Sequence, residues 1–240
     1  MLDQANDLRE LVRQCAVPQA RPAGPSPRRI VLCGGKEGVG TTTLGVNLAV
    51  LLAQSGTRTV LVDTAQGSRH TPCAVRPPLL QFGGRHSESA CYYGADAVVF
   101  DVGNPPDRLA RRLWQAADER LFITTADTAA IIDAYATIKL LSEPAHAEPI
   151  WLLVNAAESA ESGVEAHRRL ERACRRFLGI TLTDGGCVPL DPEVPKAAWA
   201  SKPFVLAAPS CSASRSLDRL ANLVNSQRLA KPQAAALHTS

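Results

Sequence analysis

A glycine-rich segment, residues 34–43 with the sequence GGKEGVGTTT, carries the residue types best suited to binding a phosphate group. It lies between a short apolar run at 30–33 and a longer apolar segment at 44–53. Backbone N–H groups in such a turn, together with the N-terminus of a following helix, bind anions. In the pattern G-x-x-x-x-G-K-[ST], Gly35, Gly40 and Thr42 are in register, but Thr41 occupies the lysine position. The segment therefore predicts a phosphate-binding loop with one altered position.

Two carboxylates follow apolar runs further along the chain. Asp63 ends the run 59–62, and Asp101 ends the run 97–100. The carboxyl ends of parallel strands meet at one edge of a sheet, and Mg²⁺ prefers hydroxyl and carboxylate oxygens. Thr42, Asp63 and Asp101 are thus the predicted Mg²⁺ ligands, partly through water. The alternative is that each aspartate only caps or turns the chain after its strand.

The lysine missing from the phosphate loop has no obvious replacement. A charge-assisted contact with a phosphate contributes about 1.5 to 3 kcal/mol, whereas Thr41 offers a neutral hydroxyl. Lys36 supplies the ammonium inside the turn. It is either an ordinary exposed turn lysine, or a group that leans over its own loop or reaches a facing subunit.

Strand-like and helix-like segments alternate along most of the chain, which predicts an α/β fold of three layers with a doubly wound, mostly parallel sheet. The segment 64–96 has almost no periodic apolar pattern and is predicted to be a long loop with at most one helical turn. Besides the runs above, we expect strands at 120–125, 150–155 and near 187–188, and helices at 44–53, 107–117, 128–141, 163–178, 194–200 and 212–225.

The two ends of the chain differ in composition from this core. We expect a helix at 1–16, a proline-rich linker at 17–28, the globular domain at 29–226 and a disordered tail at 227–240. The first helix is either a frayed terminus or a recognition element for a groove on a partner.

Composition narrows the class of protein. A chain of 240 residues with 45% hydrophobic content can bury one core, and a net charge of +3 does not by itself predict nucleic-acid binding. Its seven cysteines include no C-x-x-C pair, which argues against a disulfide framework or a zinc ribbon. With no signal peptide and no membrane-spanning run, we expect a cytoplasmic protein.

The loop resembles the deviant phosphate loop of MinD/ParA-type ATPases, K-G-G-x-G-K-[ST], which Lys36, Gly38 and Gly40 match. The resemblance continues into the segment GVNLA at 45–49. It implies that ATP or ADP binds with Mg²⁺, that Lys36 contacts phosphate across a homodimer, and that Asp63 assists catalysis. The nucleotide-binding residues that it implies are Gly35, Lys36, Gly38, Val39, Gly40, Thr41, Thr42 and Thr43 at the phosphates, Asn155 at the adenine, and Pro189 and Asp191 in the loop beside the base.

Within that family, the chain is similar to flagellar-number regulators of the FlhG (FleN) type. The segment DQANDLR at 3–9 resembles their D-Q-A-x-x-L-R helix. Thr124 and Thr125, followed by DAYATIK at 133–139, resemble their T-D-A-Y-A-x-I-K stretch. The resemblance implies a signal-recognition-type GTPase partner, FlhF, with flagellar basal-body components as further partners, and recruitment to the cell pole or flagellar base. The implied partner-binding residues are Asp3, Gln4, Ala5, Leu8 and Arg9.

Three departures from the family pattern affect its hydrolytic machinery. Thr41 replaces the loop lysine, Glu37 brings a carboxylate into the turn, and Ala65 stands where the family has a second carboxylate. We therefore expect nucleotide binding with weak or lost ATP hydrolysis. Pro232 interrupts the C-terminal segment, so we expect no strong membrane anchor.

Two alternatives stay open. One is a slow but active ATPase that drives a dimer switch. The other is a ParA-type partition ATPase that binds DNA without sequence preference through the basic segment 168–176, for which a solvated helix face is the favoured explanation.

Overall fold

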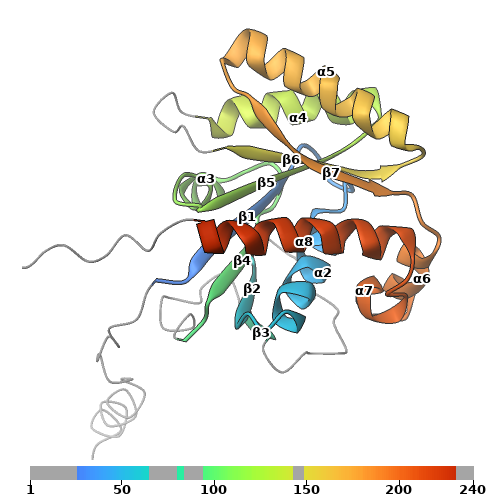
Figure 1. Ribbon diagram of the computed structural model, residues 1–240. Helices are drawn as coiled ribbons and strands as arrows, with labels where there is room; N and C mark the ends of the chain where they lie inside the picture. Colours follow the sequence, from blue (N-terminus) through green and yellow to red (C-terminus); the bar gives the residue numbers. More distant parts are fainter. Residues whose placement is uncertain (1–25, 65–79, 84–93, 143–148, 231–240) are drawn as a thin grey trace, which may run out of the picture.

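The computed structural model describes residues 26–64, 80–83, 94–142 and 149–230 (Figure 1). The predicted helix 1–16 with its partner-binding residues, most of the predicted linker, and Ala65 lie outside the described residues. Of the predicted tail 227–240, residues 231–240 also lie outside them.

A single parallel sheet forms the centre of the molecule. Its seven described strands run in the order β3-β2-β4-β1-β5-β6-β7, and every neighbouring pair is parallel. The strands are β1 (Arg28–Gly34), β2 (Thr59–Asp63), β3 (Leu80–Gly83), β4 (Ala97–Asp101), β5 (Glu119–Thr125), β6 (Ile150–Ala157) and β7 (Leu182–Pro189).

The described helices connect β1 to β2 and each strand from β4 to β7 to the next, and helices cover both faces of the sheet (Figure 1). Parallel strands require such crossover connections, and burial of both sheet faces explains why most of the strands are continuous apolar runs. The described helices are α2 (Thr41–Gln54), α3 (Arg108–Gln115), α4 (Thr128–Leu141), α5 (Ala160–Leu178), α6 (Glu193–Trp199), α7 (Phe204–Ala207) and α8 (Ser212–Ala230).

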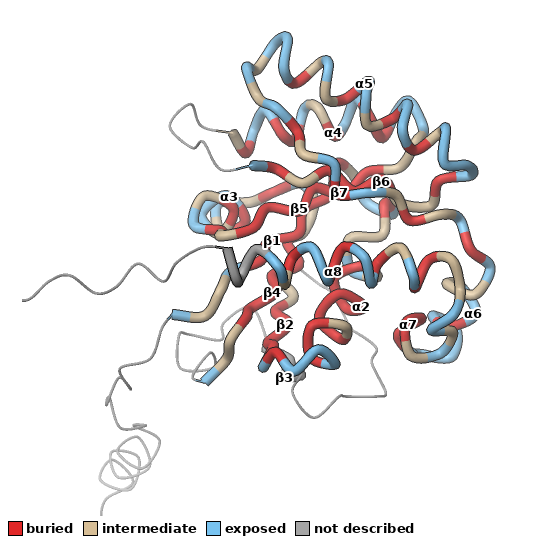
Figure 2. The backbone as a smooth tube through the Cα atoms, viewed as in Figure 1, coloured by how far each residue is buried: buried red, intermediate tan, exposed pale blue. Residues whose placement is uncertain are grey.

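The sheet separates two apolar cores, so the predicted three-layer, doubly wound fold is confirmed (Figure 2). In the first core, Leu48 of α2 and Leu217 of α8 pack against one face of the sheet. In the second, Trp114 of α3, Ile138 of α4 and Leu170 of α5 pack against the other. The carboxyl ends of the strands therefore lie between the helices that pack on the two faces of the sheet.

Strands β1, β2 and β4 are neighbours, and their carboxyl ends define the place where a ligand is expected. Asp63 and Asp101 are direct register partners across β2 and β4. Leu32 of β1 is the partner of Asp101 on the other side. The prediction that both aspartates reach the same edge of the sheet is therefore confirmed.

The prediction of a continuous loop over 64–96 was wrong, because β3 forms within it and pairs with β2. A four-residue edge strand is too short to leave a period in the sequence. Strand β7 is longer than the segment expected near 187–188, and the short α7 was not expected. Helix α8 ends at Ala230 rather than 225, so the predicted tail does not begin at 227.

None of the described helices has both the length and the apolar character needed to cross a membrane.

Candidate functional site

A cleft of about 670 Å³ opens at the carboxyl edge of the sheet. Four segments meet there: the glycine-rich loop after β1, the start of α2, Thr64 directly after β2, and the segment after β4. Its lining residues are Lys36, Glu37, Gly38, Gly40, Thr41, Thr42, Thr43, Thr64, Asp101, Val102, Gly103, Asn104, Pro105 and Asp107. The structure thus brings most of the predicted phosphate-loop residues into one cleft with Asp101.

The backbone of the loop has the conformation that its glycines permit. Gly38 and Gly40 have φ values of 82° and 92°, which residues with a side chain rarely adopt. A Cβ on Gly40 would also collide with the amide nitrogen of Asn155. Gly40 is the N-cap of α2 and offers no side chain to its N–H groups, and the first turn contains no acidic residue. The start of α2 is therefore suited to an anion.

The predicted metal ligands form a connected group. The side chain of Thr42 hydrogen-bonds to Asp101, and Asp63 lies opposite Asp101 in register. Burial raises the pKa of Asp101 to about 6; the hydrogen bond from Thr42 acts in the other direction, and the negative charge of Asp63 raises it further. A cation bound here would favour the charged form of Asp101.

The donor set fits Mg²⁺ carried by a nucleotide. The Asp101 Oδ2 atom is buried and has no hydrogen-bond partner among the described residues. The described residues contain no group of three or more His, Cys, Asp or Glu that could hold a metal by themselves. Mg²⁺ commonly binds through one or two carboxylates together with substrate phosphates and water. Thr42, Asp101 and Asp63 are suited to that role.

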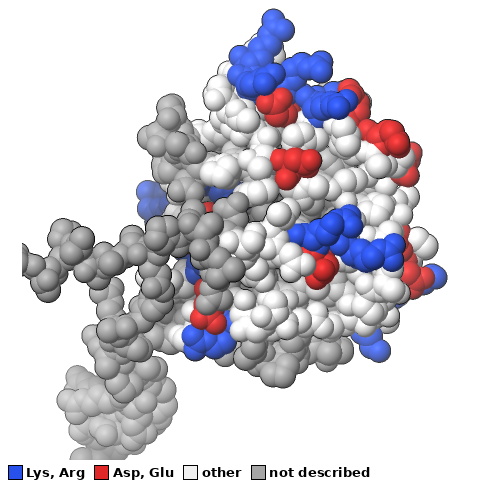
Figure 3. Space-filling view, viewed as in Figure 1, with Lys and Arg blue, Asp and Glu red and all other residues white. Residues whose placement is uncertain are grey.

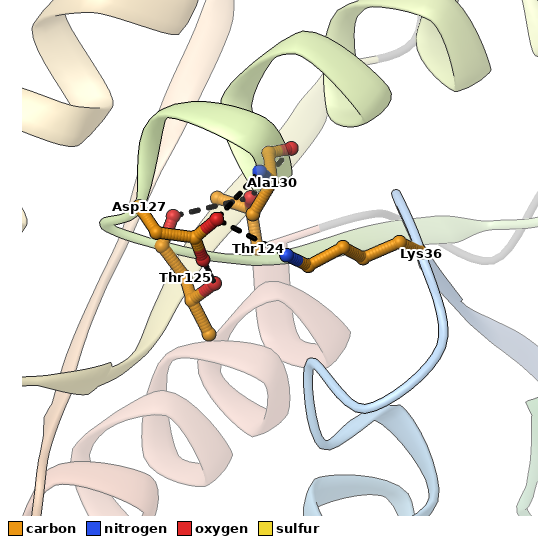
Figure 4. A network of polar contacts seen from close by, with 5 residues as sticks. All are labelled: Lys36, Thr124, Thr125, Asp127 and Ala130. Carbon is orange, nitrogen blue, oxygen red and sulfur yellow. Dashed lines mark hydrogen bonds and ion pairs between the residues drawn. The ribbon is translucent and has the colours of Figure 1, made fainter.

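Lys36 lines the cleft, but its ammonium group is paired with a residue outside the lining. Its Nζ atom is 3.0 Å from Oδ1 of Asp127, the N-cap residue of α4 (Figure 4). The same carboxylate accepts hydrogen bonds from Thr125 and from the backbone N–H of Ala130. These two hydrogen bonds lower the pKa of Asp127 to about 2. The bond from Thr125 has the largest effect, and Lys36 makes a smaller contribution. In this structure Lys36 therefore contacts a helix cap of its own chain.

Asn104 is a cleft residue that the sequence reasoning missed. Its side-chain amide donates to the carbonyl oxygen of Gly34, the last residue of β1, at 2.7 Å. The contact links the segment after β4 to the start of the glycine-rich loop, 70 residues earlier. An asparagine three positions beyond Asp101 was the available signal, but the pairing itself could not be read from the chain.

A second, smaller pocket of about 90 Å³ adjoins the first. Thr43 lines both pockets. Asn155, Pro189 and Asp191, the residues predicted to lie at the base, line the second. The Asn155 amide donates to the carbonyl oxygen of Val39 at 2.8 Å, which fixes the side chain against the loop.

Asp191 has a structural role at this pocket. Its carboxylate accepts hydrogen bonds from the N–H of Glu193, from the N–H and hydroxyl of Ser212, and from the N–H of Ala213. These contacts join the starts of α6 and α8. They also lower the pKa of Asp191, and the hydrogen bond from the Ser212 hydroxyl has the largest effect. Asp191 therefore shapes the pocket wall.

Two predicted phosphate-loop residues support the cleft from outside its lining. Val39 is buried in the apolar core beneath the loop. Gly35 packs on α4, where a Cβ would lie 2.6 Å from the backbone nitrogen of Ala134. Their effect on a bound phosphate would act through the shape of the loop.

Comparison with known protein families agrees with this geometry. The family described as the CobQ/CobB/MinD/ParA nucleotide binding domain matches residues 30–204, from β1 to the start of α7. The matched segment includes both pockets and most of the sheet.

Two relatives align with most of the chain. The antiactivator FleN of Pseudomonas aeruginosa is 28% identical over an alignment that covers 82% of this chain and 86% of that protein. The flagellum site-determining protein YlxH of Helicobacter pylori is 23% identical, with 82% of each chain covered.

Solved structures share the fold. The septum site-determining protein MinD of Pyrococcus horikoshii, complexed with Mg-ADP, superposes with a TM-score of 0.65 at 16% identity, covering 87% of this chain and 99% of that chain. The cell division protein MinD of Aquifex aeolicus has a TM-score of 0.64 at 19% identity, with 83% and 97% covered.

Proposed function

Because this chain belongs to the CobQ/CobB/MinD/ParA nucleotide-binding family, we propose that it is a MinD-like nucleotide-binding regulator of flagellar number or placement. The similarity to FleN over 82% of the chain is the observation that carries the flagellar part of this proposal. The similarity to YlxH supports the same conclusion.

The nucleotide spans the two pockets in this proposal. Its phosphates bind the N–H groups of the loop and of the first turn of α2, and its base occupies the pocket at Asn155 and Pro189. Thr43, which lines both pockets, supports this continuity. Mg²⁺ would be held by Thr42 and Asp101, with Asp63 acting through water, and it would neutralise phosphate charge. The Mg-ADP complex of the Pyrococcus MinD supports this ligand class.

ATP hydrolysis is weak or lost in the proposed function. The loop has Thr41 in place of a lysine, and Glu37 adds a negative charge to the cleft. Lys36, the residue that resembles the lysine acting across the family dimer, is paired with Asp127 and would have to leave it before reaching a second copy of the chain. A slow ATPase that switches a homodimer remains the alternative; its signature is phosphate release that Lys36→Ala removes.

The partner in this proposal is an FlhF-type GTPase, engaged by residues 1–16. The segment at 3–9 supports this assignment through its resemblance to the D-Q-A-x-x-L-R helix. Asp3, Gln4, Ala5, Leu8 and Arg9 are the proposed contact residues. Flagellar basal-body components are the further partners we propose, and through such partners the chain would reach the cell pole or the flagellar base.

Two measurements test the proposal. Calorimetry of the full chain with Mg·ADP and Mg·ATP should detect binding of at least one nucleotide. The GTPase rate of an FlhF-type partner from the same organism should rise when the full chain is added. Replacing Leu8 and Arg9 with alanine should remove that rise, while alanine at the exposed Asn222 of α8 should preserve it. If the GTPase rate does not change with the intact chain, the partner assignment is wrong.

A basic surface on α5 is the observation behind a second candidate function, DNA binding, although a solvated helix face stays the favoured explanation. In Figure 3, Lys and Arg side chains gather over α5 at the top of the view. Among acidic neighbours, Glu171 is paired with Arg175 at 3.6 Å. Salt-sensitive binding to generic duplex DNA, lost on replacing the arginines, would support a ParA-type role. The exposed basic residues are Arg168, Arg169, Arg172, Arg175 and Arg176.

A further inference from the structure

Two side chains of the cleft converge on Gly34 at the end of β1. The Asn104 amide donates to the Gly34 carbonyl oxygen at 2.7 Å. On the same residue, a Cβ would lie only 2.6 Å from the Thr41 hydroxyl oxygen. Thr41 and Asn104 therefore approach the root of the loop together, and both also line the cleft. Position 41, where the usual loop pattern has lysine, thus lies against the same residue that Asn104 holds.

The charges around the cleft are unfavourable for a highly charged anion. Among the described lining residues, Lys36 is the only cation, and Glu37, Asp101 and Asp107 are carboxylates. The Lys36 ammonium lies 3.0 Å from Asp127, which is not a lining residue. Loop N–H groups can bind phosphate oxygens. Among the described lining residues, Lys36 alone carries a charge that could neutralise a third phosphate, and its ammonium is paired with Asp127.

Asn104 supplies a neutral donor where a cation is missing. An amide carries two N–H bonds, and the contact with Gly34 uses one of them. The amide can therefore hold the loop to the segment after β4 and still present a donor to the cleft. A neutral donor is a weaker phosphate ligand than an ammonium, and the difference grows with the charge of the ligand.

We infer that this cleft selects a Mg²⁺-bound nucleoside diphosphate over the corresponding triphosphate, with Asn104 as the positioning residue that replaces the loop lysine. The inference rests on the proposed nucleotide binding and names the ligand class of that site. The charge of the cleft sets the preference for the diphosphate, and the bond from Asn104 to Gly34 sets the shape of the loop for either nucleotide.

Calorimetry of the full chain with Mg·ADP and Mg·ATP tests the ligand preference. We expect the wild type to bind Mg·ADP at least about tenfold more tightly than Mg·ATP. A tenfold ratio corresponds to ~1.4 kcal/mol, which is close to the lower end of what one charge-assisted contact contributes. Thr41→Lys should raise the affinity for Mg·ATP more than that for Mg·ADP and so narrow the ratio. Equal affinities, or tighter ATP binding, in the wild type would overturn the preference while leaving nucleotide binding intact.

A double-mutant cycle tests the role of Asn104. Asn104→Ala should weaken the binding of Mg·ADP and of Mg·ATP by roughly the same factor, because it loosens the loop without changing the charge of the cleft. In the Thr41→Lys background the loss should be smaller, because the lysine takes over the donor role. Asn222→Ala, at an asparagine whose side chain bonds to Asp218 on the surface of α8, should change neither affinity.

The outcomes of the cycle separate the two proposals. Independent effects of the two substitutions, measured on variants that retain the wild-type circular dichroism spectrum, would show that Asn104 does not replace the lysine. If Asn104→Ala fails to fold, Asn104→Ser keeps a donor and should bind both nucleotides more weakly than the wild type. Absence of binding by either nucleotide to the wild type would overturn the proposed function itself, together with the preference.

Discussion

Asp101 shows how one buried carboxylate links the stability of the protein to its ligand. The residue is only 4% exposed, and its pKa is raised to about 6, first by burial and then by Asp63. The folded chain therefore holds a proton on Asp101 at pH values where the unfolded chain, with an ordinary pKa of 3.8, has lost it. By linkage, the contribution of this group to stability falls as pH rises from about 4 to about 6.

Replacing Asp101 with asparagine should remove this pH dependence. We expect the melting temperature of Asp101→Asn, relative to the wild type, to increase as pH rises from 4 to 7, because only the wild type acquires a buried charge. The measurement is thermal unfolding of both proteins in EDTA without nucleotide, at pH values across that range. A constant difference between the two melting temperatures would contradict the raised pKa.

At the scale of one secondary-structure element, α4 depends on Asp127 for its first turn. The Asp127 carboxylate accepts the N–H of Ala130 at 2.9 Å and also pairs with Lys36. Asp127→Ala should cost about 1 kcal/mol of unfolding free energy, because the cap is lost. Asp127→Asn keeps a capping oxygen and removes the charge, so it should cost only a few tenths of a kcal/mol. Urea denaturation measures the free energy of unfolding of both variants. If both lose the same amount relative to the wild type, the loss comes from the ion pair with Lys36 and not from the cap.

The contact between the glycine-rich loop and α4 gives a second prediction at this scale. A Cβ on Gly35 would lie 2.6 Å from the backbone nitrogen of Ala134 and 2.7 Å from its Cα, and backbone atoms of a helix interior cannot yield cheaply. Gly35→Ala should therefore cost about 1 to 3 kcal/mol, as overpacking does. It should also weaken nucleotide binding, because the loop must move.

Gly45→Ala is the matched control for that substitution. Gly45 is also buried, but a Cβ there would meet Leu32 at 3.6 Å and Asp101 at 3.9 Å, which are ordinary contacts. In the middle of α2, alanine should stabilise the protein by up to about 1 kcal/mol. If both variants lose the same free energy in urea denaturation, the close approach of Gly35 to α4 does not explain the first result.

At the scale of the whole molecule, the sequence predicted the architecture better than it predicted the pairing of side chains. Alternating apolar runs specified the parallel sheet, and strand ends placed Asp63 and Asp101 at one edge, because a parallel sheet leaves few other arrangements. Strand β3 was missed because an edge strand of four residues has no periodic pattern and depends on β2 for its pairing.

The contacts that the sequence did not predict are those between distant segments. Lys36 pairs with a residue 91 positions away, and Asn104 bonds to one 70 positions away. Local spacing identifies a loop or a strand end, but it carries no information on which side chain from another crossover reaches it. The sequence itself shows that Thr41 departs from the usual loop, whereas the bond from Asn104 to Gly34 required the fold.

The cleft joins segments that are far apart in the chain, so a bound nucleotide should stabilise the whole domain. The loop after β1, the start of α2 and the segment after β4 all line it, and they are anchored in both apolar cores. A ligand that binds only the folded state at 100 times its Kd adds about 2.7 kcal/mol. For a domain of this size, that corresponds to a rise in melting temperature of roughly 5 to 11 °C. Scanning fluorimetry with saturating Mg·ADP should show this rise, and Mg²⁺ alone should not, because the described residues form no metal site by themselves.

Asp101→Asn should reduce the rise in melting temperature with Mg·ADP, since the carboxylate proposed to hold the cation is gone. An equal rise in that variant would mean that the nucleotide binds without the metal at Asp101.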